Sequence, residues 1–538
     1  MERREIIKRL SALPLAGAML PLESMVDFQP RRANAAPAQN IYQSLGVEPV
    51  INCRGTFTII GGSIEKPEVL EAKRAASSNF VQLDELALAV GQRLADLTGA
   101  EWGMVPAGCA CGLKLVTAAC VTGGNPERLV RIPNLTGFDK TEVVSYRRTT
   151  YDSAVTNIGV TMINVDTPEQ MANAISSKTA MIFHIANNDV PADGPFSLEQ
   201  VSRMAKPLNI PILVDAAAED LTVPNVHLQR GATVVAYSGG KALCGPQSAG
   251  LLLGSKDILM SAWQASSPHH GPGRDNKVGK DEQVGMVAAV EAWIKWDHAE
   301  KVRTWNMWLQ NIARRLSAIN GITCTVGDLP RGLGNRSLRL SISWNPEVFN
   351  LYGTDVAEIL ATTKPRIALS GSYMDNNGMT GVSITSGQMQ PGEDRIVADR
   401  LFEVLSQKYD KPKGMDAPSV NVSGRWDVEI EFFSSKGLHS FHIEQDGNYL
   451  SGTHKGEFTI RDMYGVVDGN KIALYSVERQ NSRTVPFTFH GTATNNKMEG
   501  GIYMGEYLRV KGFTASRYEQ ARPANPRIVV PQGQPLSS

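Results

Sequence analysis

The 538-residue sequence lacks an excess of charge of either sign, because 54 lysines and arginines balance 54 aspartates and glutamates. A nucleic-acid surface needs a basic excess, so this balance argues against a nucleic-acid partner. Long apolar runs are also missing, and no segment has the length and character of a membrane-spanning helix. We therefore expect a globular protein of two or three domains with no stable membrane insertion.

Cysteine is scarce and is not spaced in pairs. The six cysteines lie at positions 53, 109, 111, 120, 244 and 324, which predicts structural thiols and no disulfide framework. Cys109-Ala110-Cys111 has no second pair and no nearby histidine, and the C-terminal histidines fall on separate predicted strands. We therefore predict no metal site.

The first residues have the layout of an export signal. "MERREIIKRLSALPLAGAMLPL" places Arg3 and Arg4 before a short apolar stretch, and Ala33-Asn34-Ala35 offers a cleavage site. We predict a twin-arginine signal peptide over residues 1–35, export to the periplasm or beyond, and the twin-arginine machinery as a partner. The alternative is a basic amphipathic first helix. The twin-arginine route carries proteins that have already folded in the cytoplasm.

Apolar strands alternate with helical stretches over residues 36–410, which predicts an α/β fold with a mostly parallel sheet. We assign a large domain to about 76–298, and a small α+β domain to 36–75 and 299–410. Residues 281–316 are predicted to form one long helical stretch.

The C-terminal part follows a different period. Residues 411–422 are polar and contain proline and glycine, which indicates a linker. Apolar and polar residues then alternate over 423–520, with turn residues between the runs, and this pattern predicts an antiparallel barrel or sandwich of about eight strands. Residues 521–538 are proline-rich and are expected to be a loose tail.

One lysine stands at the end of a buried strand in "VVAYSGGKALCGPQSAGLLLG" (234–254). A lysine held in a cleft can have a lowered pKa, and its free amine can then form a Schiff base with a carbonyl. Asp215 ends the preceding predicted strand, "PILVDAAAE". Because consecutive parallel strands end side by side, we expect Asp215 and Lys241 to share one crevice.

These two residues fit the needs of pyridoxal phosphate, an electron sink whose ring nitrogen requires an acidic partner. Its phosphate needs amide donors at a helix start, and "PAGCACG" supplies them. The predicted donors there are Ala107, Gly108, Cys109 and Ala110. The hydroxyl of Ser238, three residues before Lys241, is a further candidate. The sequence therefore predicts a pyridoxal-phosphate enzyme.

Several motifs together resemble the selenocysteine synthase-like group of fold type I pyridoxal-phosphate enzymes, most of all its D-glucosaminate-6-phosphate ammonia-lyase branch. The motifs are VINCRGTFTIIGGS (50–63), VPAGCACGLKL, PILVDAAAE, YSGGKALCGPQSAGLLLG, GRDNKVGKDEQVG (273–285) and QPGEDRIVADRL (390–401). The resemblance implies that Lys241 carries the cofactor, that Asp215 contacts the pyridine nitrogen, and that 107–110 bind the phosphate. It also implies a homodimer or higher oligomer with active sites at the subunit boundary.

Three basic residues are candidates for binding the anionic groups of a substrate. Arg366 in "KPRIAL" lies where fold type I enzymes commonly hold a substrate carboxylate, through the bidentate geometry of arginine. Its alternative is an ordinary surface arginine. Arg54 and Lys277 are the other two candidates.

Two further positions are predicted to contact the cofactor ring. Asn187 or Asn188, after the strand "MIFHIAN", is placed to touch its ring oxygen. The related branch usually has a stacking histidine before its "YD" pair, whereas here "SYRRTTYDSA" has Arg147, whose guanidinium can also lie flat on a ring.

The expected chemistry begins with removal of a Cα proton by Lys241. The resemblance favours β-elimination, as in an ammonia-lyase or dehydratase acting on an amino acid or amino sugar acid. A racemase and a transaminase share the first step and stay open as alternatives. A non-enzymatic alternative is a decayed enzyme core that acts as a binding protein and presents the C-terminal β domain to a ligand.

Overall fold

A computed structural model describes residues 40–186, 194–411, 413–477, 485–505, 507 and 510–519. The predicted signal peptide and C-terminal tail lie outside this part. Residues 40–49 belong to a unit separate from the rest and hold one short helix, α2 (Ile41–Ser44), whose first turn is capped by Asn40. Among the described residues, no helix combines the length and the apolar character that crossing a membrane requires.

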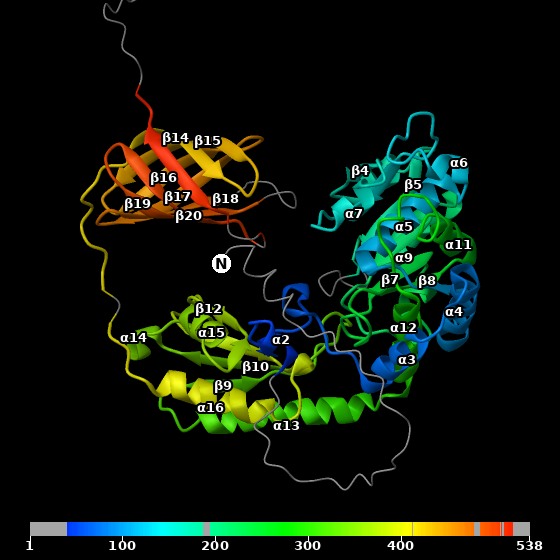
Figure 1. Cartoon of the computed structure of the whole chain (residues 1–538), viewed down its shortest axis with the longest axis horizontal. Coiled ribbons are helices and arrows are strands. Elements are labelled where there is room, and N and C mark those ends of the chain that lie inside the picture. Colours follow the sequence, from blue (N-terminus) through cyan, green and yellow to red (C-terminus); the bar gives the residue numbers. More distant parts are fainter. Residues whose placement is uncertain are drawn as a thin grey trace, which may run out of the picture. The chain divides into compact units, whose positions relative to one another are not determined.

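A seven-stranded sheet in the order β2-β8-β7-β6-β5-β3-β4 forms the centre of the large domain (Figure 1). Its strands are β2 (Trp102–Met104), β3 (Glu142–Ser145), β4 (Thr161–Asn164), β5 (Thr179–Ile185), β6 (Ile212–Asp215), β7 (Val234–Ser238) and β8 (Gly250–Gly254). Only β8 runs antiparallel to its neighbours. The central strands β5 and β6 are buried along almost their whole length because helices cover both faces of the sheet. The predicted α/β fold is confirmed.

Ten helices of the described chain surround this sheet. They are α3 (Pro67–Ser77), α4 (Leu83–Thr98), α5 (Cys109–Thr122), α6 (Pro126–Leu129), α7 (Asp152–Thr156), α8 (Pro168–Ala174), α9 (Leu198–Ala205), α10 (Val226–Gln229), α11 (Lys256–Gln264) and α12 (Lys280–Lys295). One core cluster contains α5 and α11, and a second contains α9 and α12. Helix α3 packs against α12 and so belongs with the large domain, although residues up to 75 are predicted to belong to the small one.

The small domain is built on a four-stranded antiparallel sheet in the order β12-β13-β10-β9. These strands are β9 (Thr323–Val326), β10 (Arg339–Trp344), β12 (Ser370–Ser372) and β13 (Thr380–Thr385). A separate parallel pair joins β1 (Val50–Asn52) to β11 (Arg366–Ala368). The helices of the small domain are α13 (His298–Leu316), α14 (Pro346–Phe349), α15 (Gly353–Thr362) and α16 (Glu393–Ser406). Of these, α13 and α16 lie side by side (Figure 1).

The predicted single helical stretch 281–316 is wrong in one respect. Helix α12 ends at Lys295, Trp296 is extended, and α13 begins at His298. The side chain of Asp297 accepts a hydrogen bond from the amide of Glu300 at 2.9 Å and so caps the new helix. This break places the first turn of α13 beside the cavity described below.

The C-terminal domain is a closed antiparallel barrel, which decides between the two predicted β architectures. Its eight strands are β14 (Gly424–Glu431), β15 (Lys436–Asp446), β16 (Tyr449–Lys455), β17 (Ile460–Asp468), β18 (Lys471–Val477), β19 (Phe487–Ala493), β20 (Lys497–Tyr503) and β21 (Gly512–Arg517). Alternate residues point inward, and Trp426, Phe441 and Phe489 are fully buried there. Pairing of β14 with β21 closes the ring and leaves no free sheet edge.

Polar side chains also enter the barrel core. His454 is fully buried, and its two ring nitrogens lie 2.7 Å from Nδ1 of His439 and 2.8 Å from Oγ of Ser476. Burial lowers the pKa of His454 to about 3, so its ring stays neutral in the folded barrel. The described residues contain no group of three or more histidine, cysteine, aspartate or glutamate side chains able to hold a metal.

The two glycines before Lys241 are needed because the chain folds back on itself there. A Cβ at Gly239 would lie 2.7 Å from the carbonyl oxygen of Ala249, and a Cβ at Gly240 would lie 2.6 Å from Cα of Gln247. The Gly239 amide also donates to the Ala249 carbonyl at 2.9 Å. The segment after β7 is therefore held tightly against residues 245–249, and this contact fixes where Lys241 leaves the sheet.

We expect Gly240→Ala to lower the stability of the large domain by about 1–3 kcal/mol, because the added methyl meets backbone atoms that cannot move aside independently. Differential scanning calorimetry measures this as a lower transition temperature. Gly414→Ala is the matched control, since a Cβ at Gly414 meets nothing within 4 Å. An unchanged transition temperature in Gly240→Ala would contradict the close packing described above.

Candidate active site

Asp215 and Lys241 come together at the carboxyl edge of the sheet. Asp215 is the last residue of β6, and its register partner in β7 is Ala236, five residues before Lys241. Asp215 is 7% exposed, and its Oδ1 accepts hydrogen bonds from the Ala217 amide at 3.0 Å and from Sγ of Cys109 at 3.6 Å. The charge of Lys241 acts on Asp215 and on Cys109. Three predicted site residues are thus neighbours in space.

The carboxyl group of Asp215 is poised for a cationic partner. Burial raises its pKa, while the Ala217 amide, the charge of Lys241 and the Cys109 thiol act in the opposite direction. Burial also raises the pKa of Cys109, so the thiol stays protonated and donates to Asp215. A positively charged group placed against this carboxyl would compensate its lost hydration and favour the ionised form.

The first turn of α5 is suited to binding an anion. Gly108 is its N-cap with φ of +85°, and no side chain caps the turn, so the amides of Cys109, Ala110 and Cys111 face outward from the helix start. Gly250 of β8 lets the loop lie close, since a Cβ there would be 2.6 Å from the carbonyl carbon of Gly108. The loop predicted to bind phosphate therefore begins a 14-residue helix.

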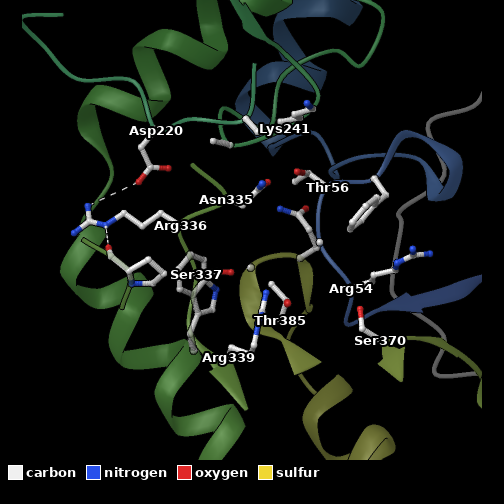
Figure 2. A pocket seen from close by; sticks show the side chains of 18 of the residues that line it. Arg54, Thr56, Asp220, Lys241, Asn335, Arg336, Ser337, Arg339, Ser370 and Thr385 are labelled. Carbon is white, nitrogen blue, oxygen red and sulfur yellow. Dashed lines mark hydrogen bonds and ion pairs between the residues drawn. The ribbon is translucent and has the colours of Figure 1, made fainter. Parts of the chain in front are cut away.

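Both domains line a cavity of about 660 Å³ next to Lys241 (Figure 2). This volume suits a small-molecule ligand. Seven charged side chains line the cavity, and they are Arg54, Lys241, Lys301, Arg336, Arg339, Asp220 and Asp328. The excess of cationic groups favours a ligand with negative charge.

Asp220 and Arg336 form an ion pair across the domain boundary at one side of the cavity, with 3.9 Å between Oδ2 and Nη1 (Figure 2). The guanidinium is held further by a hydrogen bond from Nε to the Pro330 carbonyl at 3.2 Å. Burial raises the pKa of Asp220, and the charges of Lys301 and Arg336 oppose this rise. Asp220 therefore helps to hold two cations at the cavity wall.

Two other predicted residues also belong to this region. Arg54 lines the cavity, and its guanidinium lies 4.5 Å from the ring centroid of Phe57. Ser238 ends β7 half-buried, and its amide donates to the Ala217 carbonyl at 3.2 Å, two residues beyond Asp215.

The structure does not bring the remaining predicted residues to the cavity. Nε of Arg366 donates to the Ala361 carbonyl at 2.6 Å, in the last turn of α15, so its side chain is held by that helix end. Lys277 and Arg147 are exposed and do not line the cavity. The predicted carboxylate, anion and ring-stacking roles of these three residues gain no support here. Asn187 lies outside the described residues.

Sequence reasoning missed the cavity residues contributed by α13 and the small domain: Lys301, Trp305, Arg336 and Arg339, together with Asp220 of the large domain. The sequence offered a hint that Asp220 belongs to the site, because Asp220 follows Asp215 by five residues in the loop after the same strand. The sequence offered a weaker hint for Lys301, because Trp293, Trp296 and Trp305 lie close to it along the chain.

Comparison with known proteins now identifies the family. No family model matches the chain. D-glucosaminate-6-phosphate ammonia lyase of Salmonella typhimurium is 30% identical over 383 residues, which are 69% of this chain and 99% of that protein. A solved structure of a D-glucosaminate-6-phosphate ammonia-lyase superposes with a TM-score of 0.62 at 29% identity, covering 69% of this chain and all of that one.

The chain belongs to the fold type I pyridoxal-phosphate enzymes. Its similarity extends to a 5'-C-glycyluridine monooxygenase-decarboxylase of Streptomyces sp, 26% identical over 392 residues, 70% of this chain and 94% of that protein. An L-seryl-tRNA(Sec) selenium transferase of Proteus mirabilis is 24% identical over 291 residues, 47% of this chain and 58% of that protein. The predicted family and the predicted cofactor are confirmed.

The site residues fit the cofactor of this family. The Asp215 carboxyl is buried, and burial raises its pKa. A protonated pyridine nitrogen placed against it would favour the ionised form, which is the acidic partner that this nitrogen requires. The uncapped start of α5 offers amides to the phosphate. Lys241 leaves the next strand within reach of the charge on Asp215 and offers the amine that holds the cofactor aldehyde.

We expect purified wild-type protein to be yellow and Lys241→Ala to be colourless after desalting, because the variant lacks the amine that retains the cofactor covalently. Visible absorbance spectra of the two proteins at equal concentration provide the measurement. Lys178→Ala, at an exposed lysine before β5, is the matched control and should keep the visible band. A Lys241→Ala protein that retained the same band would show that another residue holds the cofactor.

Proposed function

We propose that this fold type I enzyme is a lyase that removes a Cα proton and a β-substituent and releases ammonia and a keto acid. The observation that carries the proposal is the pairing of Asp215 and Lys241 at adjacent strand ends beside the uncapped α5, in a chain that matches nearly the whole length of an ammonia lyase. The racemase and transaminase alternatives use the same residues and have no separate observation in their favour.

Each site residue has a defined task in this reaction. Bound pyridoxal phosphate supplies an electron sink that acidifies the Cα–H bond of the substrate. Lys241 would hold the cofactor through its amine, and the same amine, when free, would take the Cα proton. Asp215 would keep a proton on the ring nitrogen, and the Cys109 thiol donates a hydrogen bond to its Oδ1.

The proposed substrate is an amino acid or amino sugar acid with at least one further anionic or polyhydroxyl group. Arginine side chains on the cavity wall support this choice, because guanidinium groups bind carboxylates and phosphates through paired hydrogen bonds. Arg54, Arg336 and Arg339 line the cavity and are the candidates in place of Arg366. The 660 Å³ volume accommodates such a molecule beside the cofactor.

Export through the twin-arginine pathway is part of the proposal, supported by Arg3-Arg4 and the Ala33-Asn34-Ala35 cleavage motif. We expect protein recovered from the periplasm or medium of a bacterial host to begin at Ala36, as read by N-terminal sequencing. Arg3→Lys with Arg4→Lys should retain the full-length chain inside the cell. A mature N-terminus at Met1 would contradict the signal peptide.

A homodimer or higher homo-oligomer is likewise proposed, with active sites near the subunit boundary. Apolar side chains exposed on one segment support it, namely Phe57, Ile59, Ile64, Phe80 and Val81. The mass of the native protein in solution tests this assembly.

We expect cofactor-loaded protein to release ammonia and a keto acid from at least one member of a panel of D- and L-amino acids and amino sugar acids. The panel should include serine, threonine and aminated aldonic acids with and without a phosphate group. Ammonia, keto acid and optical rotation are followed together, with Lys241→Ala as the inactive control. Transfer of the amino group to an added keto acid without free ammonia would favour a transaminase, and loss of optical rotation alone would favour a racemase.

A further inference from the structure

Lys301 is a second lysine at the cavity wall, and the function proposed above leaves it without a task. It lies in the first turn of α13 and lines the same cavity as Lys241. Its Nζ lies 5.4, 5.0 and 4.8 Å from the ring centroids of Trp293, Trp296 and Trp305. Three indole faces therefore fix the position of the ammonium group.

Trp293, Trp296 and Trp305 form a cage around the Lys301 amine, and this tryptophan cage is itself held in place. Nε1 of Trp293 donates to the Leu221 carbonyl at 2.8 Å, directly after Asp220 in the chain. The Trp293 and Trp296 rings lie 5.3 Å apart, and Trp305 is a buried residue that also lines the cavity. Aromatic faces attract the positive charge but accept no proton, so the cage positions Lys301 without using its N–H groups.

The N–H groups of Lys301 remain available to a ligand. Over the part of the chain that the structure describes, no acceptor atom lies within hydrogen-bonding or ion-pair distance of Nζ. Burial lowers the pKa of Lys301, and the nearby charge of Asp220 opposes this shift. A lysine ammonium of lowered pKa that retains its proton donors is suited to act as a general acid.

We propose that Lys301 is a catalytic residue that protonates the oxygen leaving the β-carbon of the substrate. The proposal rests on the elimination reaction proposed above. When Lys241 takes the Cα proton, the electron pair of that bond forms the Cα–Cβ double bond and the Cβ–O bond breaks. The departing oxygen takes one proton from Lys301 and leaves as water from a hydroxyl. Lys301 is then a neutral amine and Lys241 an ammonium, and proton exchange with solvent restores both.

This assignment gives the reaction two separate proton carriers on different elements. Lys241 follows β7 of the large domain, whereas Lys301 lies in the first turn of α13 of the small domain. A hydroxide ion is a poor leaving group, so an acid at the β-oxygen is needed for a β-hydroxy substrate and is unnecessary when chloride leaves. Dependence on the leaving group is therefore the property that separates an acid from a structural cation.

The test compares serine with β-chloroalanine, both in the configuration that the wild-type enzyme accepts. If the enzyme turns over only a larger member of the panel, that β-hydroxy substrate and its β-chloro analogue take the places of serine and β-chloroalanine throughout. We expect Lys301→Met to lower kcat/KM for serine by about 100-fold or more, within the range of general acid catalysis, and to change that for β-chloroalanine by less than about threefold. Lys301→Arg should resemble Lys301→Met, because arginine keeps the charge in the cage but does not release a proton at neutral pH.

Lys256→Met is the matched control, since Nζ of Lys256 lies 4.2 Å from the centroid of the Trp102 ring and Lys256 does not line the cavity. It should leave both substrates unaffected. Two measurements do not depend on turnover: the visible absorbance titration with pyridoxal phosphate and the thermal transition should match wild type in Lys301→Met. Exchange of the serine Cα–H with deuterated water should continue in Lys301→Met, because Lys241 is intact.

Different failures are distinguishable in this design. Equal losses with serine and β-chloroalanine, or full activity of Lys301→Arg, would overturn the acid role and leave the lyase intact. Loss of Cα–H exchange in Lys301→Met would also overturn it, because the defect would then precede the departure of the leaving group. A wild-type enzyme that eliminates from neither substrate and from no member of the wider panel would refute the lyase proposal itself, and the role of Lys301 with it.

Discussion

The parallel pairing of β6 with β7 determines where the chemistry takes place. Their register sets Asp215 beside Ala236, so the chain that leaves β7 must pass close to the Asp215 carboxyl before it reaches Lys241. Gly239 and Gly240 allow that passage because side chains there would meet backbone atoms of residues 245–249. The positions of the acid and the amine are therefore consequences of sheet geometry and of close backbone contact, which is far stiffer than a pair of flexible side chains.

The barrel has its own core and shares none of this machinery. Trp426, Phe441 and Phe489 belong to a hydrophobic cluster separate from the three clusters of the preceding residues. Its ring is closed, and the buried His454 is hydrogen-bonded on both ring nitrogens by groups of the barrel itself. Because 99% of the Salmonella ammonia lyase is matched by 69% of this chain, that relative performs its reaction without a counterpart of the remaining third.

Prediction from sequence succeeded where the placement of a residue depends on neighbouring strand ends. The α/β fold, the positions of Asp215 and Lys241, and the glycine at the start of α5 all follow from short local patterns. It failed where residues distant in sequence meet: Arg336 and Lys301 reach the cavity only because the small domain folds against the strand-end loops. Arg366 shows the same limit, since a local motif does not reveal that the helix end at Ala361 binds its side chain. The break between α12 and α13 at Asp297 was not predicted, because the helical spacing of apolar residues continues across it.

The charges of the site are divided according to the needs of the two halves of the reaction. Asp215 is buried at the end of β6, and burial raises its pKa although the Ala217 amide, the charge of Lys241 and the Cys109 thiol oppose this rise. At the other side, Asp220 faces Lys301 and Arg336, and its carboxylate lowers the cost of keeping two cations in a partly buried wall. In the proposed elimination, one group removes the Cα proton and another donates a proton at Cβ. Lys241 and Lys301 lie on different elements, and the three indole faces around Lys301 make the surroundings of its amine unlike those of Lys241 in the loop after β7.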